Sequence, residues 1–134
     1  METIGITTEI QMLAWTMVLG LLHIVLGVAL VTRDKGLKWN VGARDTEGAP
    51  VGAVTDRVNR ALRNFLETFP FFAAAVLAAA VAGRLDATTA LGAQLYFWAR
   101  LVYIPLYAAG VPYIRTVVWG VSIVGLVMVL AALF

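Results

Sequence analysis

The chain has 134 residues, of which 61% are hydrophobic and only 13% are charged, and its mean hydropathy is +0.87. A soluble domain normally carries about 25% charged residues, so this composition predicts a single integral membrane domain over residues 1–134. The formal net charge of +2 is too small to indicate a nucleic-acid partner. With no cysteine and with His23 as the one histidine, disulfides, a cysteine nucleophile and a multi-histidine metal site are excluded, and we expect no metal.

The N-terminal segment has two acidic residues and no basic one in the run METIGITTEIQ. A secretory signal peptide begins with a basic region that precedes a short apolar core. We therefore expect the first hydrophobic helix to be retained.

Four stretches approach the roughly 20 apolar residues that a helix needs to cross the hydrocarbon core of a bilayer. The first is predicted over residues 8–32, because Ile10–Thr32 carries no charge. The other three are predicted over residues 56–83, 87–110 and 113–134. The expected fold is an all-α membrane protein built as a four-transmembrane-helix bundle.

The only long connection covers residues 33–55 and is rich in glycine and mixed charge, as surface loops are. Basic residues gather in it and directly after it: Arg33, Lys35, Lys38, Arg44, Arg57, Arg60 and Arg63. The connection Arg84–Asp86 carries a single base. The positive-inside rule therefore predicts that the long loop is cytoplasmic and that both termini lie outside.

Polar residues occupy one narrow stripe of the second predicted helix. At about 100° per residue, this stripe contains Arg57, Arg60, Asn64 and Glu67, whereas Arg63 falls outside it and is expected to reach toward lipid headgroups. Charged side chains at membrane depth are costly and usually mark a functional site. The stripe is therefore the first place to look for function.

The third predicted helix has a matching stripe of Tyr96, Arg100, Tyr103 and Tyr107. A very short turn joins the two helices, so they should pack as an antiparallel hairpin. With a rise of about 1.5 Å per residue, Glu67 and Arg100 come to the same depth and are predicted to form an ion pair. We expect six residues to line one cleft open to the cytoplasm: Arg60, Asn64, Glu67, Arg100, Tyr103 and Tyr107.

The chemistry of this cleft suits a small zwitterionic ligand with amide groups, such as a peptide-like metabolite. Arginines bind carboxylates through two parallel hydrogen bonds, and Glu67 with the Asn64 carbonyl suits an ammonium or amide donor. The chain offers no strong nucleophile here, so a reactive group should come with the ligand. An arginine close to a thiol favours the thiolate, and Arg115, at the head of the fourth span, is the best-placed candidate.

Other interpretations of these residues stay open. The polar set could be a network that only fixes helix packing. Pro70 and Pro105 could widen the cleft or could be ordinary kinks. His23 is expected to pack or hydrogen-bond between helices, Glu9 to be solvated or near lipid headgroups, and Trp119 to be a packing or interface residue.

Two motifs resemble those of the MAPEG family, the membrane-associated proteins in eicosanoid and glutathione metabolism. They read Arg57-x-x-Arg60-Ala61-x-x-Asn64-x-x-Glu67 before Phe69-Pro70, and Ala99-Arg100-x-x-Tyr103-x-x-x-Tyr107. The length and the four-span layout are similar too, and the wording of both motifs is most similar to the bacterial branch.

The resemblance implies a homotrimer with a glutathione site between neighbouring subunits. By position, Arg60, Asn64, Glu67, Tyr103 and Tyr107 would contact glutathione, Arg100 would support Glu67, and Arg115 would be the catalytic arginine that stabilises the glutathione thiolate. Arg33, Lys35 and Arg44 are all candidates for a further ligand contact.

The predicted function is that of an integral membrane glutathione transferase or peroxidase, with glutathione as co-substrate and a hydrophobic electrophile dissolved in the lipid bilayer as its partner. The expected location is a bacterial inner membrane. Two alternatives remain: a non-catalytic membrane scaffold or regulator, and a small four-helix transporter.

Overall fold

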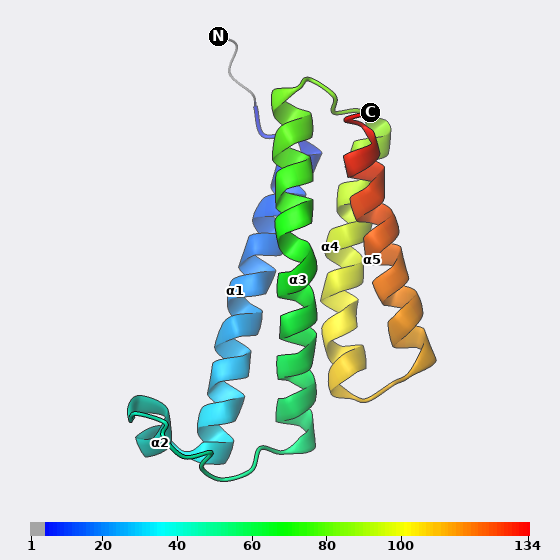
Figure 1. The fold of residues 1–134 in the computed structure, drawn as a ribbon. Helices are drawn as coiled ribbons and strands as arrows, with labels where there is room; N and C mark the ends of the chain where they lie inside the picture. The colour runs from blue at the N-terminus through cyan, green and yellow to red at the C-terminus, as the bar shows by residue number, and fades with distance from the viewer. Residues whose placement is uncertain (1–4) are drawn as a thin grey trace.

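Within residues 5–134, the part of the chain that the computed structural model describes, all regular secondary structure is helical (Figure 1). In chain order the helices are α1 (Thr8–Lys35), α2 (Leu37–Val41), α3 (Ala53–Val81), α4 (Ala87–Ala108) and α5 (Tyr113–Ala131). The predicted all-α class is therefore confirmed. Helices α3 and α4 continue through Pro70 and Pro105.

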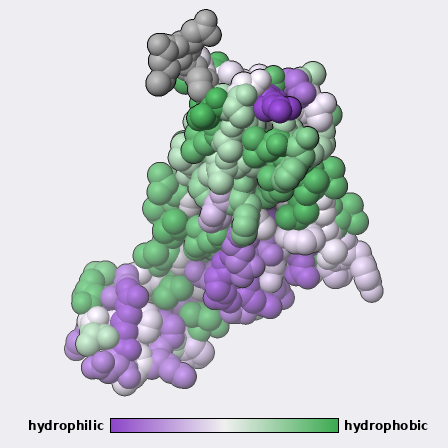
Figure 2. All heavy atoms as spheres, turned by 45° about the horizontal axis from the view of Figure 1, so that its top comes forward, coloured by the Kyte–Doolittle hydropathy of each residue, from purple (hydrophilic) through white to green (hydrophobic). Residues whose placement is uncertain are grey.

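Three of these helices, α1, α3 and α5, are long and apolar enough to cross a membrane. Helix α4 has 22 residues but is not among them, because Gln94 and Arg100 lower its hydropathy. The protein is thus membrane-spanning, while the span predicted over residues 87–110 stays a prediction. Figure 2 shows hydrophobic residues over much of the visible face and hydrophilic residues gathered at the end that holds α2, with a smaller hydrophilic cluster opposite.

The four long helices run side by side, with α2 projecting beside the end of α1 (Figure 1). The most extensive contact joins α4 to α5, and α1 packs chiefly on α3. Apolar residues of α1, α3, α4 and α5 form the core, in which the ring of Tyr96 stacks on Phe72 with centroids 4.0 Å apart. The hydroxyl of Tyr96 lies 2.8 Å from the Thr68 hydroxyl, so this member of the predicted stripe is a core residue.

Helix α1 is held to α3 by close packing and one buried hydrogen bond. Gly20 leaves room for Phe65, whose ring would lie 2.8 Å from a Cβ at that position. His23 donates through Nε2 to the Val58 carbonyl oxygen at 3.0 Å. The prediction that His23 serves packing or an interhelical hydrogen bond is confirmed.

Glu9 departs from the prediction that it is solvated or lies near lipid headgroups. Its side chain is only 4% exposed, and one carboxylate oxygen accepts a hydrogen bond of 2.7 Å from the Thr89 hydroxyl. The reason is that the start of α1 packs against the start of α4, where Thr89 belongs to a capping box with Asp86. A charge in this first turn also interacts favourably with the α1 dipole.

The connection between α1 and α3 folds around Trp39. Lys35 and Arg44 lie 4.7 and 5.2 Å from the centre of its ring, and its Nε1 donates to the Thr46 carbonyl oxygen at 2.8 Å. Lys35 also donates to the Ala49 carbonyl oxygen at 2.9 Å. Both bases are therefore used to fold the loop.

Candidate functional site

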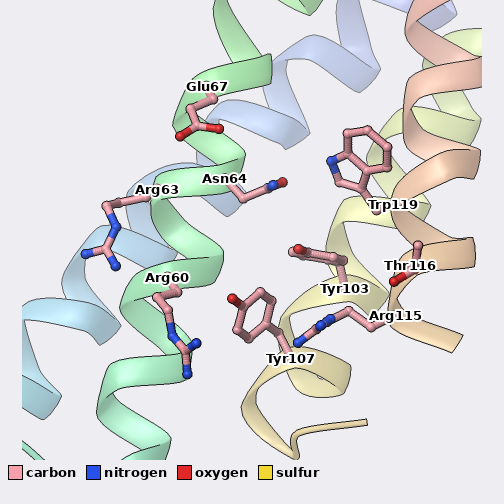
Figure 3. Close-up of a pocket in the computed structure, with 9 residues that line it drawn as sticks. All are labelled: Arg60, Arg63, Asn64, Glu67, Tyr103, Tyr107, Arg115, Thr116 and Trp119. Atoms are coloured by element: carbon pink, nitrogen blue, oxygen red, sulfur yellow. The ribbon is translucent and has the colours of Figure 1, made fainter. Parts of the chain in front are cut away.

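A pocket of about 430 Å³ opens between α3, α4 and α5 (Figure 3). This volume lies in the range of small-molecule sites. Its walls are formed by Arg60, Arg63, Asn64, Glu67, Tyr103, Tyr107, Arg115, Thr116 and Trp119. Five of the six residues predicted to line one cleft therefore do so, and Arg115 joins them.

The α3 wall follows the stripe that the sequence predicted. Arg60, Asn64 and Glu67 are separated by four and three residues, so they lie one above the other on one helix face. Arg60 forms an ion pair with Asp56, with nitrogen and oxygen 3.0 Å apart, and both side chains are about half exposed. An exposed pair of this kind contributes little stability, so Arg60 is available to a ligand.

Two arginines converge on Tyr107 from different helices. The guanidinium carbon of Arg60 lies 5.7 Å from the centre of the Tyr107 ring, and that of Arg115 lies 4.5 Å from it. Tyr103 meets Tyr107 edge-on with centroids 5.5 Å apart. This end of the pocket therefore concentrates positive charge beside two phenol groups, as Figure 3 shows.

Arg115 stands in the first turn of α5, which begins at Tyr113. The dipole of a helix is positive at its N-terminus, so a cation there is unfavourable unless an anion joins it. Within the described residues Arg115 has no ion pair. The arginine and the helix terminus together form a site suited to an anion.

Arg100 does not line the pocket but lies behind its α3 wall. It is 1% exposed and donates through Nη1 to Oδ1 of Asn64 at 2.9 Å. Its guanidinium carbon also lies 4.6 Å from the centre of the Tyr103 ring. Arg100 uses one of the two acceptor positions of the Asn64 carbonyl oxygen. The second position and the amide nitrogen of Asn64 remain to bind a ligand.

The predicted ion pair between Glu67 and Arg100 is wrong. Glu67 is exposed in the pocket and forms no ion pair with any described residue. The reason is that Arg100 is held instead by Asn64, one helical turn nearer the start of α3, and by the Tyr103 ring. Glu67 therefore offers a free carboxylate to the pocket.

Three lining residues are additions to the predicted set: Arg63, Thr116 and Trp119. Arg63 is exposed at the rim, and Figure 3 shows its guanidinium directed away from Tyr103 and Tyr107. Trp119 lies four residues after Arg115 and three residues after Thr116, so it shares one face of α5 with each of them. That spacing would have found both residues had α5 been expected beside α3 and α4.

Arg57, a member of the predicted stripe, does not line the pocket. It donates through Nη1 to the Ala108 carbonyl oxygen at 3.4 Å. A cation beside the last carbonyl groups of a helix is favourable, so Arg57 stabilises the end of α4.

The MAPEG family model matches residues 12–134. The chain therefore belongs to the MAPEG family, which includes glutathione-dependent membrane enzymes. No curated protein and no solved structure matches it.

Proposed function

We propose that this protein binds glutathione in the pocket between α3, α4 and α5 and acts as a membrane glutathione transferase or peroxidase on hydrophobic electrophiles. The observation that carries the proposal is that one pocket holds both a free carboxylate, Glu67, and two arginines that converge on Tyr107. Membership of the MAPEG family supports it.

The pocket complements glutathione group by group. Glutathione carries two carboxylates, one ammonium, two amides and a thiol. Arg60 suits a carboxylate, because guanidinium and carboxylate match in a planar pair. Glu67 suits the ammonium, and the free amide nitrogen of Asn64 suits a peptide carbonyl. The Tyr103 hydroxyl adds a further hydrogen-bonding group on the opposite wall.

Arg115 is the residue proposed to activate the thiol. A positive charge next to a thiol lowers the pKa of that thiol, so the thiolate is the form present near neutral pH. The thiol proton leaves to water, and the sulfur then attacks an electrophilic carbon. An apolar acceptor reaches the site from the bilayer, where it concentrates, while the tripeptide arrives from water.

The finer architecture that we propose is a four-transmembrane-helix bundle that assembles as a homotrimer. The pocket is open on one side in the single chain, and a neighbouring subunit would close it there. Of the three bases considered for this contact, Lys35 and Arg44 are engaged with Trp39. Arg33 forms an ion pair with Asp34, with nitrogen and oxygen 3.0 Å apart, and its side chain is 63% exposed. Because an exposed ion pair contributes little stability, Arg33 is the base that we propose a neighbour would contribute.

The thiol pKa of bound glutathione tests the proposal directly. The ultraviolet absorbance of the thiolate is followed against pH with glutathione and detergent-purified protein. We expect the midpoint to fall clearly below the value of about 8.5 for a free thiol, and to return toward it in Arg115→Ala.

Arg84→Ala is the matched control, since it removes one arginine from the opposite end of the molecule, and it should titrate like the parent protein. A bound thiol that titrates like free glutathione in the parent would contradict the proposed activation. Equal midpoints in the parent and Arg115→Ala would remove Arg115 from that role.

A further inference from the structure

Trp119 is the one large apolar side chain that α5 contributes to the pocket. It lines the cavity and is 36% exposed. Figure 3 shows the indole extending over the pocket, with its nitrogen-bearing edge toward Asn64 and Glu67 of α3. A tryptophan that only anchors a helix at the membrane surface would lie on the outer face of the protein. Trp98 on α4 is 57% exposed and lies outside this pocket.

The indole of Trp119 lies close to the positively charged end of the pocket. Arg60, Tyr107 and Arg115 gather the positive charge at one end. Trp119 follows Arg115 by one helical turn, which is about 6 Å along the axis of α5. The indole therefore lies beside the place where a sulfur anion held by Arg115 would react.

We propose that Trp119 forms the acceptor face of the site, that is, the surface against which the electrophilic substrate binds. Through this contact the protein prefers electrophiles whose reactive carbon is conjugated to a planar aromatic ring. This inference rests on the proposed glutathione site and adds the class of the second substrate. An aromatic ring offset on the indole gains stacking energy beyond its burial, whereas a flexible alkyl chain gains only burial and loses conformational freedom. Conjugation keeps the reactive carbon in the plane of that ring.

A conjugated enone shows the reaction in balanced form. The thiolate sulfur forms a bond to the β-carbon as the carbon–carbon π bond breaks. The electron pair moves to the carbonyl oxygen as an enolate. The enolate then takes a proton at its α-carbon from water, which replaces the proton released by the thiol, and no group leaves.

The test compares two acceptors that share this reaction. One is benzylideneacetone, and the other is an enone of matched size with a linear alkyl chain in place of the phenyl ring. The kcat/KM of each acceptor is measured with saturating glutathione for the parent, Trp119→Leu and Trp119→Phe. Trp98→Leu is the matched control, because it makes the same change at an exposed tryptophan outside the pocket.

We expect Trp119→Leu to lower the ratio of kcat/KM for the phenyl enone over the alkyl enone roughly three- to tenfold. This range corresponds to the free energy that an aromatic pair contributes beyond its burial. Trp119→Phe keeps an aromatic face and should retain most of the preference. Trp98→Leu should leave the ratio unchanged. A ratio that is the same in the parent and Trp119→Leu would overturn the inference.

Two further results would also overturn it, and glutathione titration shows whether the proposed function fails with it. If the parent turns over neither enone but binds glutathione, the acceptor face is wrong while the tripeptide site stands. If the parent also fails to bind glutathione, the inference and the proposed site fall together.

Discussion

Arg100 carries a positive charge in the interior with a single described hydrogen bond, to Asn64. Its Nε and Nη2 atoms have no hydrogen-bond partner among the described residues. The faces of Tyr103 and Phe65, 4.6 and 5.7 Å from the guanidinium carbon, supply further attraction. A buried charge with few partners is sensitive to the loss of any one of them.

Asn64→Ala is therefore expected to lower the free energy of unfolding by about 1.5–3 kcal/mol, the usual worth of a hydrogen bond to a charged group. Arg100→Met with Asn64→Ala should recover much of this loss, because the uncompensated charge is then gone. Reversible unfolding in mixed detergent micelles, read as a double-mutant cycle, measures the coupling. Single-variant effects that add to within about 0.5 kcal/mol would contradict it.

At the scale of single residues, the sequence predicted which residues line the pocket better than it predicted which side chains they contact. Helical periodicity placed Arg60, Asn64 and Glu67 on one face, and they line the pocket. The Glu67–Arg100 pair was wrong because matching depth does not determine which rotamer a long side chain adopts. Arg100 reaches Asn64 instead, and that choice depends on packing around both side chains.

The contact between α4 and α5 depends on two glycines that let the helix backbones touch. A Cβ on Gly92 would lie 2.6 Å from the Gly125 carbonyl oxygen, and one on Gly125 would lie 2.5 Å from the Gly92 carbonyl oxygen. Backbone atoms at this distance cannot move aside without separating the helices. Small residues allow the same close approach in many membrane proteins.

Gly92→Ala should therefore destabilise the protein by about 1–3 kcal/mol, the usual cost of overpacking. It should also weaken glutathione binding, because the shifted α5 carries Arg115 and Trp119. Thermal unfolding and calorimetric titration measure the two effects. Gly120→Ala is the matched control on α5, because a Cβ at Gly120 meets nothing within 4 Å. Its affinity for glutathione should be unchanged, which would show that the effect of Gly92→Ala comes from helix packing and not from helix propensity.

At the scale of elements, hydrophobic runs were enough to predict where the long helices lie, because each is apolar and is bounded by charge or glycine. They did not reveal that α5 forms the third wall of the pocket: Arg115 was expected near the ligand thiol, but Thr116 and Trp119 were not expected to line the pocket. The fold of the long loop was also not predicted. It depends on Trp39 and its contacts with Lys35 and Arg44, which sequence periodicity does not encode.

At the scale of the whole molecule, the proposed homotrimer predicts that a neighbour completes the site. Native mass spectrometry of the protein released from detergent should give the mass of three chains. Arg33→Ala should keep this mass while lowering glutathione affinity roughly tenfold or more, because one charge-assisted hydrogen bond is lost.

Lys38→Ala is the matched control for Arg33→Ala, since Lys38 is an exposed base of the same loop region outside the pocket. Its affinity for glutathione should equal that of the parent protein. A monomer that binds glutathione with full affinity would contradict the shared site.

The central claim, that the pocket between α3, α4 and α5 binds glutathione, is tested most directly by isothermal titration of the detergent-purified protein with glutathione. We predict saturable binding by the parent and by Arg84→Ala, and clearly weaker binding by Arg60→Ala and Glu67→Gln. Absence of saturable binding by the folded parent, or equal affinity in all four proteins, would contradict the account.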